Sequence, residues 1–169
     1  DALRIAAWRP LIGRDTDARS IPAELDWMRT AVHLHKGCYR GQESVARVVN
    51  LGKPPRRLTF LQLDGSRGDL PESGARLMRG NRQVGVVTSA ARHYELGPVA
   101  LALISRNVSE DTVFDIDGVS AAQEIIVPRD GRSEDSPDER PGKDLTNKDL
   151  RRLDIPPAGS PHMSGGRKA

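Results

Sequence analysis

The feature that most constrains the fold is a run of six apolar residues at 99–104. A strand that is apolar at every position must be covered on both faces, so it lies centrally in a sheet or in a closed barrel. Residues 57–128 hold five more short segments that are typical of strands, and turn-forming residues separate them. We expect these strands at 58–63, 75–78, 84–89, 113–116 and 123–127. Six short strands at this spacing predict a small antiparallel barrel.

Two dipeptides predict the tight turns of this barrel. Gly80-Asn81 and Asp117-Gly118 each stand between two strand-like segments. Such pairs favour hairpin turns, because they tolerate the positive φ that these turns require. We therefore expect hairpins at both places.

The pattern is helical between residues 41 and 49. Gly41 is a suitable N-cap, and the acidic Glu43 in the first turn complements the positive end of the helix dipole. Pro54-Pro55 prevents the helix from continuing. One apolar face is formed by Val45, Val48 and Val49.

The chain divides into three parts by composition. We expect the end of a larger α/β domain at 1–54, the barrel at 55–128 and a disordered tail at 129–169, which together make an α+β protein. Residues 3–7 suit a short strand or a helix end, and Pro22 suits the first turn of a short helix. Residues 1–35 have few apolar side chains, so we expect them to pack on something absent from the chain. The tail has no aromatic residue and is rich in proline, glycine and charge, so it cannot bury enough apolar area to fold.

Composition narrows the classes of function. The chain of 169 residues has one cysteine, no apolar run long enough for a membrane span and no visible signal peptide, so we expect a cytoplasmic protein without membrane contact. Residues 1–57 carry 11 Lys and Arg against 6 Asp and Glu, a modest excess that could attract a polyanion. With only 4% aromatic residues available for base stacking, direct binding of nucleic acid is not expected.

Cys38 is the first candidate for chemistry. Cations and helix N-termini favour the reactive thiolate form of cysteine. Lys36 stands two residues before Cys38, Arg40 stands two residues after it, and the expected helix follows. The alternative is a buried cysteine that acts as a small hydrophobic residue.

Other local patterns are weaker. His33 and His35 stand near Cys38, but no further ligands complete a zinc site, so we expect no metal there. The basic cluster of Lys53 and Arg56-Arg57 either binds anions or, more commonly, is solvated.

The octapeptide at 36–43, K-G-C-Y-R-G-Q-E, resembles the signature of the YgfZ-type folate-binding proteins, which are relatives of the glycine-cleavage T-protein, an aminomethyltransferase. Similar segments follow at 52–58, 85–90 and 96–102, and the resemblance covers roughly residues 2–128. It implies that this chain corresponds to the C-terminal half of such a protein, and that most of the folate pocket is formed by an N-terminal part.

The resemblance also implies a function. It points to a folate-binding accessory protein that supports assembly or repair of iron–sulfur clusters in client enzymes, including tRNA-modifying ones, with tetrahydrofolate as ligand. The alternative is a tetrahydrofolate-dependent enzyme like aminomethyltransferase. Cys38 would be the functional thiol, with Lys36 beside it favouring the charged form. The residues expected at the ligand are Gly37, Tyr39, Gly41, Gln42 and Glu43.

Overall fold

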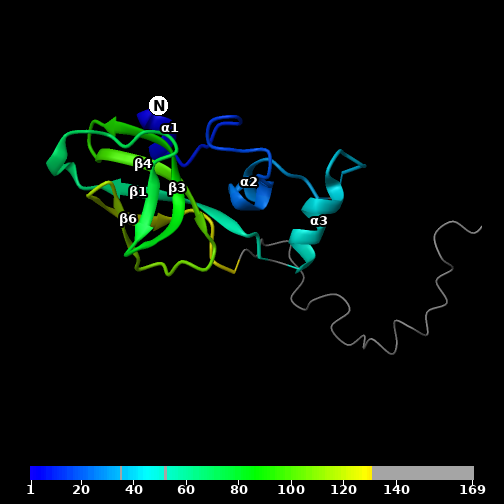
Figure 1. Ribbon diagram of the computed structural model, residues 1–169. Coiled ribbons are helices and arrows are strands. Elements are labelled where there is room, and N and C mark those ends of the chain that lie inside the picture. The colour runs from blue at the N-terminus through cyan, green and yellow to red at the C-terminus, as the bar shows by residue number, and fades with distance from the viewer. Residues whose placement is uncertain (35, 52, 131–169) are drawn as a thin grey trace, which may run out of the picture. The chain divides into compact units, whose positions relative to one another are not determined.

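The computed structural model describes residues 1–34, 36–51 and 53–130. In this part of the chain the strands are β1 (Arg56–Leu63), β2 (Arg76–Arg79), β3 (Arg82–His93), β4 (Gly97–Ser105), β5 (Val113–Ile116) and β6 (Val119–Ile125). They form a closed barrel in the order β1-β4-β3-β2-β5-β6, and every neighbouring pair is antiparallel (Figure 1). The predicted six-stranded antiparallel barrel is therefore confirmed.

The two expected hairpin turns are present. Gly80, between β2 and β3, has a φ of 57°. Asp117 and Gly118, between β5 and β6, have φ values of 51° and 84°. These left-handed conformations match the twist of the paired strands, which is why the sequence predicted both hairpins correctly.

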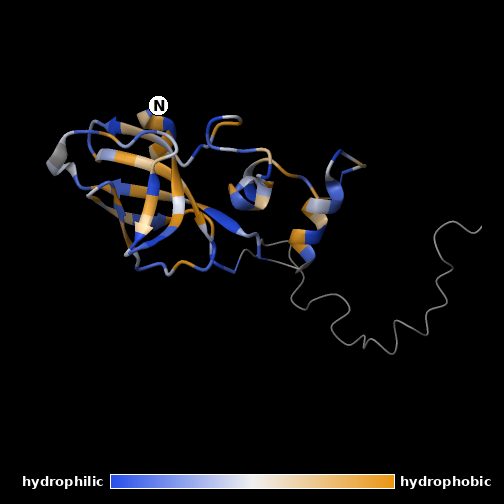
Figure 2. Ribbon diagram, in the orientation of Figure 1, coloured by the Kyte–Doolittle hydropathy of each residue, from blue (hydrophilic) through white to orange (hydrophobic). Residues whose placement is uncertain are grey.

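Strand β4 explains how the barrel is built. Its alternate residues Ala100, Ala102 and Ile104 belong to the apolar cluster that fills the barrel. The residues between them belong to a second cluster on the outer face; they are Val99, Leu101 and Leu103. Apolar residues are orange on the barrel strands in Figure 2. Both faces of β4 are buried, as its uninterrupted apolar run predicted.

The N-terminal segment covers this outer face. Helix α1 (Ala2–Ala6) contacts β3 and β4, and its Ile5 is fully buried in the outer cluster together with Leu25. The expectation that residues 1–35 pack on something absent from the chain was therefore wrong for these two side chains. The choice between a strand and a helix end at 3–7 is resolved as a helix.

Between α1 and the first strand, the described residues form the helical elements η1 (Pro22–Glu24), α2 (Trp27–Thr30) and α3 (Gln42–Leu51). Proline at the first position of η1 suits a helix start, as expected. Helix α3 contacts η1, and it buries Val45 and Val49. The helix predicted at 41–49 is thus confirmed with its apolar face. A last short turn, η2 (Gly65–Arg67), follows β1.

Some strand limits differ from the prediction. Strand β3 is longer than 84–89, and its register shifts between Val87 and Ser89, which lets the long strand bend around the barrel. Strand β6 begins directly after the turn, at Val119, and ends at Ile125. Ile126 and Val127, which we expected in that strand, pack instead in the outer cluster.

Residues 131–169 lie outside the described part of the chain, and so does nearly all of the tail predicted to be disordered. The boundaries predicted at 54/55 and 128/129 stay predictions; all described residues belong to one compact unit. Among them, no helix has the length and apolar character needed to cross a bilayer.

Candidate functional site

The octapeptide forms a turn that leads into α3. The carbonyl oxygen of Tyr39 accepts a hydrogen bond from the backbone N–H of Gln42 at 3.2 Å. The carbonyl of Gly41 then accepts from the N–H groups of Ser44 and Val45, at 3.1 and 3.3 Å, which begins the helix. Gly41 has a φ of 83°, a conformation that favours glycine. The backbone conformation therefore explains why position 41 of the motif is a glycine.

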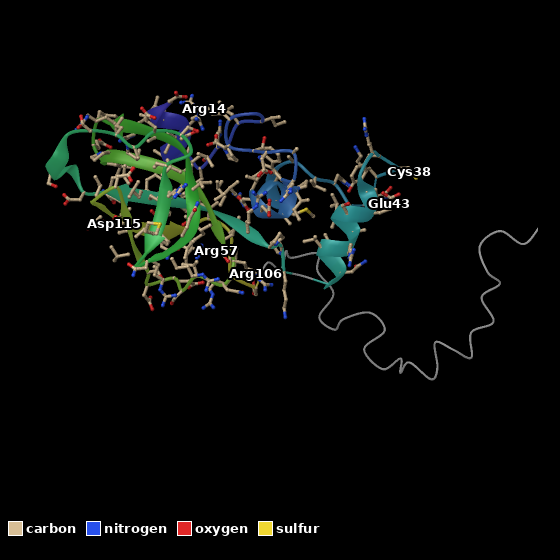
Figure 3. The ribbon with its side chains drawn as sticks, viewed as in Figure 1. Arg14, Cys38, Glu43, Arg57, Arg106 and Asp115 are labelled. Carbon is tan, nitrogen blue, oxygen red and sulfur yellow. The ribbon has the colours of Figure 1, made fainter. Side chains whose placement is uncertain are left out.

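Cys38 lies in this turn and is exposed to solvent. Figure 3 shows its side chain in the loop ahead of α3, near Glu43 in the first turn of that helix. It is the only thiol of the chain. In this structure the sulfur is therefore accessible to reagents, unlike that of a buried, structural cysteine.

The structure brings together two other predicted site residues. The Nζ of Lys36 lies 5.1 Å from the centroid of the Tyr39 ring, within the range of a cation–π contact. Gly37 is open, because a Cβ placed on it would meet no atom within 4 Å. Gln42 is half-buried and Glu43 is exposed. That Lys36 favours the Cys38 thiolate stays a prediction.

The turn has the chemistry of an accessible nucleophile or soft metal ligand. Its exposed groups are cationic at Lys36 and Arg40, and the thiol stands between them in the sequence. Within the described residues, no group of three His, Cys, Asp or Glu side chains is placed to hold a metal ion. His35, one of the two histidines considered above, lies outside those residues.

In the basic cluster of Lys53, Arg56 and Arg57, Arg56 is not simply solvated, because it is bonded to two carboxylates. Arg56 forms paired contacts to Glu24 (3.1 and 2.9 Å) and to Asp17 (2.6 and 3.1 Å). These bonds hold the pKa of Asp17 well below its usual range and raise the pKa of Arg56. Arg56 thus ties the N-terminal segment to the start of β1.

A second polar network joins the same segment to β3. Asp15 is fully buried and accepts hydrogen bonds from Arg4 Nη1 (2.8 Å), Thr88 Oγ1 (2.6 Å) and Ser89 Oγ (2.5 Å). It also accepts one from the backbone N–H of Leu11 at 2.9 Å. A buried carboxylate with four donors fixes the position of the chain around it.

Arg57 is the residue that differs most from expectation. It is fully buried, and its Nη2 donates to Gln123 Oε1 at 2.9 Å and to the Val108 carbonyl at 3.4 Å. Its Nε and Nη1 have no hydrogen-bond partner among the described residues. Burial lowers the pKa of this guanidinium. The sequence offered one usable signal. Side chains alternate between the two faces of a strand, and Arg57 is an even number of residues from Leu61 and Leu63, which face the interior.

Comparison with known proteins identifies the barrel. Residues 56–127 match the family described as the glycine cleavage T-protein C-terminal barrel domain. This range begins with β1 and ends two residues after β6. The family match and the barrel geometry therefore define the same part of the chain.

Similar curated proteins match more of the chain than the barrel alone. Aminomethyltransferase of Streptomyces coelicolor is 31% identical over 107 residues, which is 62% of this chain and 28% of that protein. The tRNA-modifying protein YgfZ of Escherichia coli O45:K1 is 35% identical over 119 residues, which is 67% of this chain and 36% of that protein. The chain thus spans about a third of the length of these relatives.

A solved structure has the same fold. Aminomethyltransferase T of the glycine cleavage system from Bartonella henselae superposes with a TM-score of 0.59 and 24% identity. The match covers 78% of this chain and 38% of that one, so it includes segments beyond the barrel.

Proposed function

We propose that this chain, whose residues 56–127 form a barrel domain of the glycine cleavage T-protein family and which is distantly related to YgfZ, is a folate-binding accessory protein. In this role it supports the assembly or repair of iron–sulfur clusters in client enzymes, including enzymes that modify tRNA. It does so without turning over a substrate of its own.

One observation carries the proposal: Cys38 is exposed in a turn whose backbone is set by Gly41 and by the start of α3. An exposed thiol is a soft ligand for iron and a redox-active group, which are the properties that cluster handling requires. The same thiol would serve no packing role. The relatives named YgfZ, at 35% identity over 119 residues, favour this branch of the family.

The other motif residues have roles around the ligand in this proposal. The Tyr39 ring, held by Lys36, covers one face of the pterin of tetrahydrofolate, while Gly37 leaves room for close approach. Gln42 and Glu43, at the start of α3, offer hydrogen-bonding groups to the ligand. The chain covers about a third of its relatives, so the remaining folate contacts are assigned to a part that this sequence does not contain. The proposed setting is the cytoplasm, where thiols stay reduced.

Complementation tests the proposal. A chimaeric gene, in which this chain replaces the matching part of YgfZ and YgfZ supplies the rest, is introduced into an Escherichia coli strain that lacks YgfZ. The activity of an iron–sulfur enzyme and the level of tRNA modification are measured. We expect restoration by the chimaera and by its Ser44→Ala variant, an exposed change in the first turn of α3, but not by its Cys38→Ala variant. Equal restoration by Cys38→Ala, or none by the unaltered chimaera, would contradict the proposal.

A second candidate is a tetrahydrofolate-dependent aminomethyltransferase. The similarity to the Streptomyces coelicolor enzyme and the shared fold with the Bartonella henselae enzyme favour it. The test is transfer of a one-carbon unit to tetrahydrofolate by the purified protein. Turnover that persists in Cys38→Ala would support this candidate over the accessory role.

A further inference from the structure

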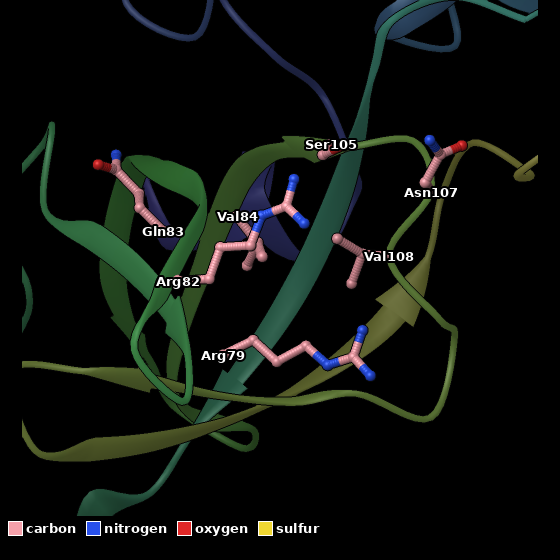
Figure 4. Close-up of a pocket in the computed structure, with 7 residues that line it drawn as sticks. All are labelled: Arg79, Arg82, Gln83, Val84, Ser105, Asn107 and Val108. Atoms are coloured by element: carbon pink, nitrogen blue, oxygen red, sulfur yellow. The ribbon is translucent and has the colours of Figure 1, made fainter.

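A pocket lies at one end of the barrel, between the β2–β3 hairpin and the loop after β4. Its volume is about 410 Å³, within the range of about 300–1,000 Å³ that is usual for small-molecule sites. Arg79 and Arg82 extend over it from the hairpin, and Ser105, Asn107 and Val108 line the opposite side (Figure 4). Cys38 and the octapeptide are not among the lining residues, so this is a separate site.

The lining is cationic. It contains two arginines and no Asp or Glu. Both Arg79 and Arg82 are exposed and line the same cavity. Neither forms an ion pair or a side-chain hydrogen bond within the described residues. Their guanidinium groups are therefore available to a ligand.

A buried charge lies behind the pocket wall. The carbonyl of Val108, whose residue lines the pocket, accepts a hydrogen bond from the fully buried Arg57. Two of the guanidinium nitrogens of Arg57 have no partner among the described residues. A buried cation of this kind is costly unless an anion is near, since few solvent dipoles reach it.

Two further arginines approach the same loop. Arg106 Nη2 donates to Asn107 Oδ1 at 3.3 Å, and Arg129 Nη2 donates to the Asn107 carbonyl at 3.4 Å. The loop also carries Glu110, which attracts Arg57, and the exposed Asp111. Even with Asp130, which follows Arg129, five arginines against three carboxylates leave this end of the barrel positive.

We propose that this end of the barrel binds the phosphate group of a small phosphorylated molecule, with Arg79 and Arg82 as its ligands. A guanidinium pairs with two oxygens of one phosphate at once, and a dianion gains more than a monocarboxylate from several converging cations. Arg57 does not contact the phosphate in this proposal. It contributes positive potential from behind the wall.

The experiment is an NMR and calorimetric titration of the full chain with pyrophosphate, ATP and acetate at physiological ionic strength. We expect saturable binding of pyrophosphate or ATP, with amide shifts at residues 79–84 and 105–108, and no such response to acetate. The double variant Arg79→Gln/Arg82→Gln should bind about tenfold or more weakly, because two charge-assisted contacts are lost. Arg76→Gln is the matched control: it removes an exposed, unpaired arginine of the same strand that lines a different pocket.

The titrations show which phosphate compound binds, and which results would contradict the site. Binding of ATP that is much tighter than that of pyrophosphate identifies a nucleotide, and equal binding identifies the phosphate alone; both support the site. Equal affinity in the native chain and the double variant would overturn it, as would an equal loss in Arg76→Gln. Binding of single-stranded RNA without any response to pyrophosphate or ATP would also overturn it. None of these results depends on Cys38 or on folate.

Discussion

The Nη1 of Arg4 lies 2.8 Å from the Oδ2 of Asp15, and this carboxylate is fully buried against β3. Arg4 also donates from Nη2 to Ser89 Oγ at 2.7 Å, and that hydroxyl in turn donates to Asp15 Oδ1. Three side chains thus form a closed polar triangle between the N-terminal segment and the barrel. The segment is held on the barrel by a buried charge pair as well as by the apolar contacts of Ile5.

Replacement of Asp15 tests this attachment. Asp15→Asn keeps the size of the side chain but removes the buried counter-charge of Arg4 and leaves it only the more exposed Asp1, so we expect a loss of about 3 kcal/mol in the free energy of unfolding. Denaturant unfolding measures it. Asp69→Asn, an exposed loop carboxylate, is the control and should change stability by less than about 0.5 kcal/mol. A similar small change in both variants would show that the network is not needed.

The ion pair between Asp17 and Arg56 predicts a specific dependence on pH. Because Arg56 lowers the pKa of Asp17 in the folded protein, the pair's contribution is complete above the ordinary carboxyl pKa of about 4 and is lost as the pH falls below it. Asp17 is half exposed, so the contribution is about 1 kcal/mol or less.

Asp17→Asn is the variant for this measurement. Its stability deficit relative to the native chain should be largest near pH 6. It should shrink as the pH is lowered toward 2, because Asp17 of the unfolded native chain then takes up a proton while the lowered pKa keeps folded Asp17 charged. A deficit that is constant across this range would contradict the assignment. Glu72→Gln, at an exposed loop position, should show no such trend.

Gly85 is required for a steric reason. A Cβ at this position would lie 2.6 Å from the carbonyl oxygen of Leu103 and 2.8 Å from Cγ2 of Ile104, both on the neighbouring strand β4. We expect Gly85→Ala to cost about 3 kcal/mol, because two paired strands of a closed barrel cannot easily separate. Gly65→Ala, where the nearest atoms are at 3.7 Å, is the control. Equal melting temperatures of the two variants would be inconsistent with this packing.

The barrel could be predicted from the sequence because its signals are local. The apolar run of β4 and the two glycine-containing turns each need only neighbouring residues to be recognised. The buried position of Asp15 could not be predicted, since its partners Thr88 and Ser89 are more than 70 residues away in the sequence. The outer cluster was missed for the same reason: Ile5 finds its partners on strands that follow much later.

The candidate site could be predicted only in part. The need for glycine at Gly41 and the helix after it follow from local backbone geometry, and the sequence indicated both. The contact of Lys36 with the Tyr39 ring was not indicated, because side-chain direction in an irregular turn is not set by spacing. Arg57 was interpreted with Arg56 as one basic cluster, although adjacent residues of a strand point to opposite faces.

Because Arg57 is buried, its replacement should change both the stability of the protein and its affinity for pyrophosphate. Arg57→Met keeps the volume of the side chain and removes a buried charge, two of whose nitrogens have no hydrogen-bond partner among the described residues, so we expect stability to rise by about 1 kcal/mol. Affinity for pyrophosphate should fall at the same time, because the positive potential behind Val108 is lost. Thermal unfolding with and without pyrophosphate measures both. A destabilised variant would indicate that the bond to Gln123 outweighs the cost of burial.

The exposure of Cys38 predicts its reactivity. In the native protein we expect iodoacetamide to label the thiol at a rate within about threefold of that in denaturant, because nothing shields an exposed sulfur. Mass spectrometry gives a clean count, since the chain has a single cysteine. Lys36→Gln, which removes the lysine two residues before the thiol, should slow labelling, whereas Lys53→Gln, an exposed lysine beyond α3, should not. Native labelling that is a hundredfold slower than in denaturant would place the sulfur in a closed environment and remove the basis for its proposed role in cluster handling.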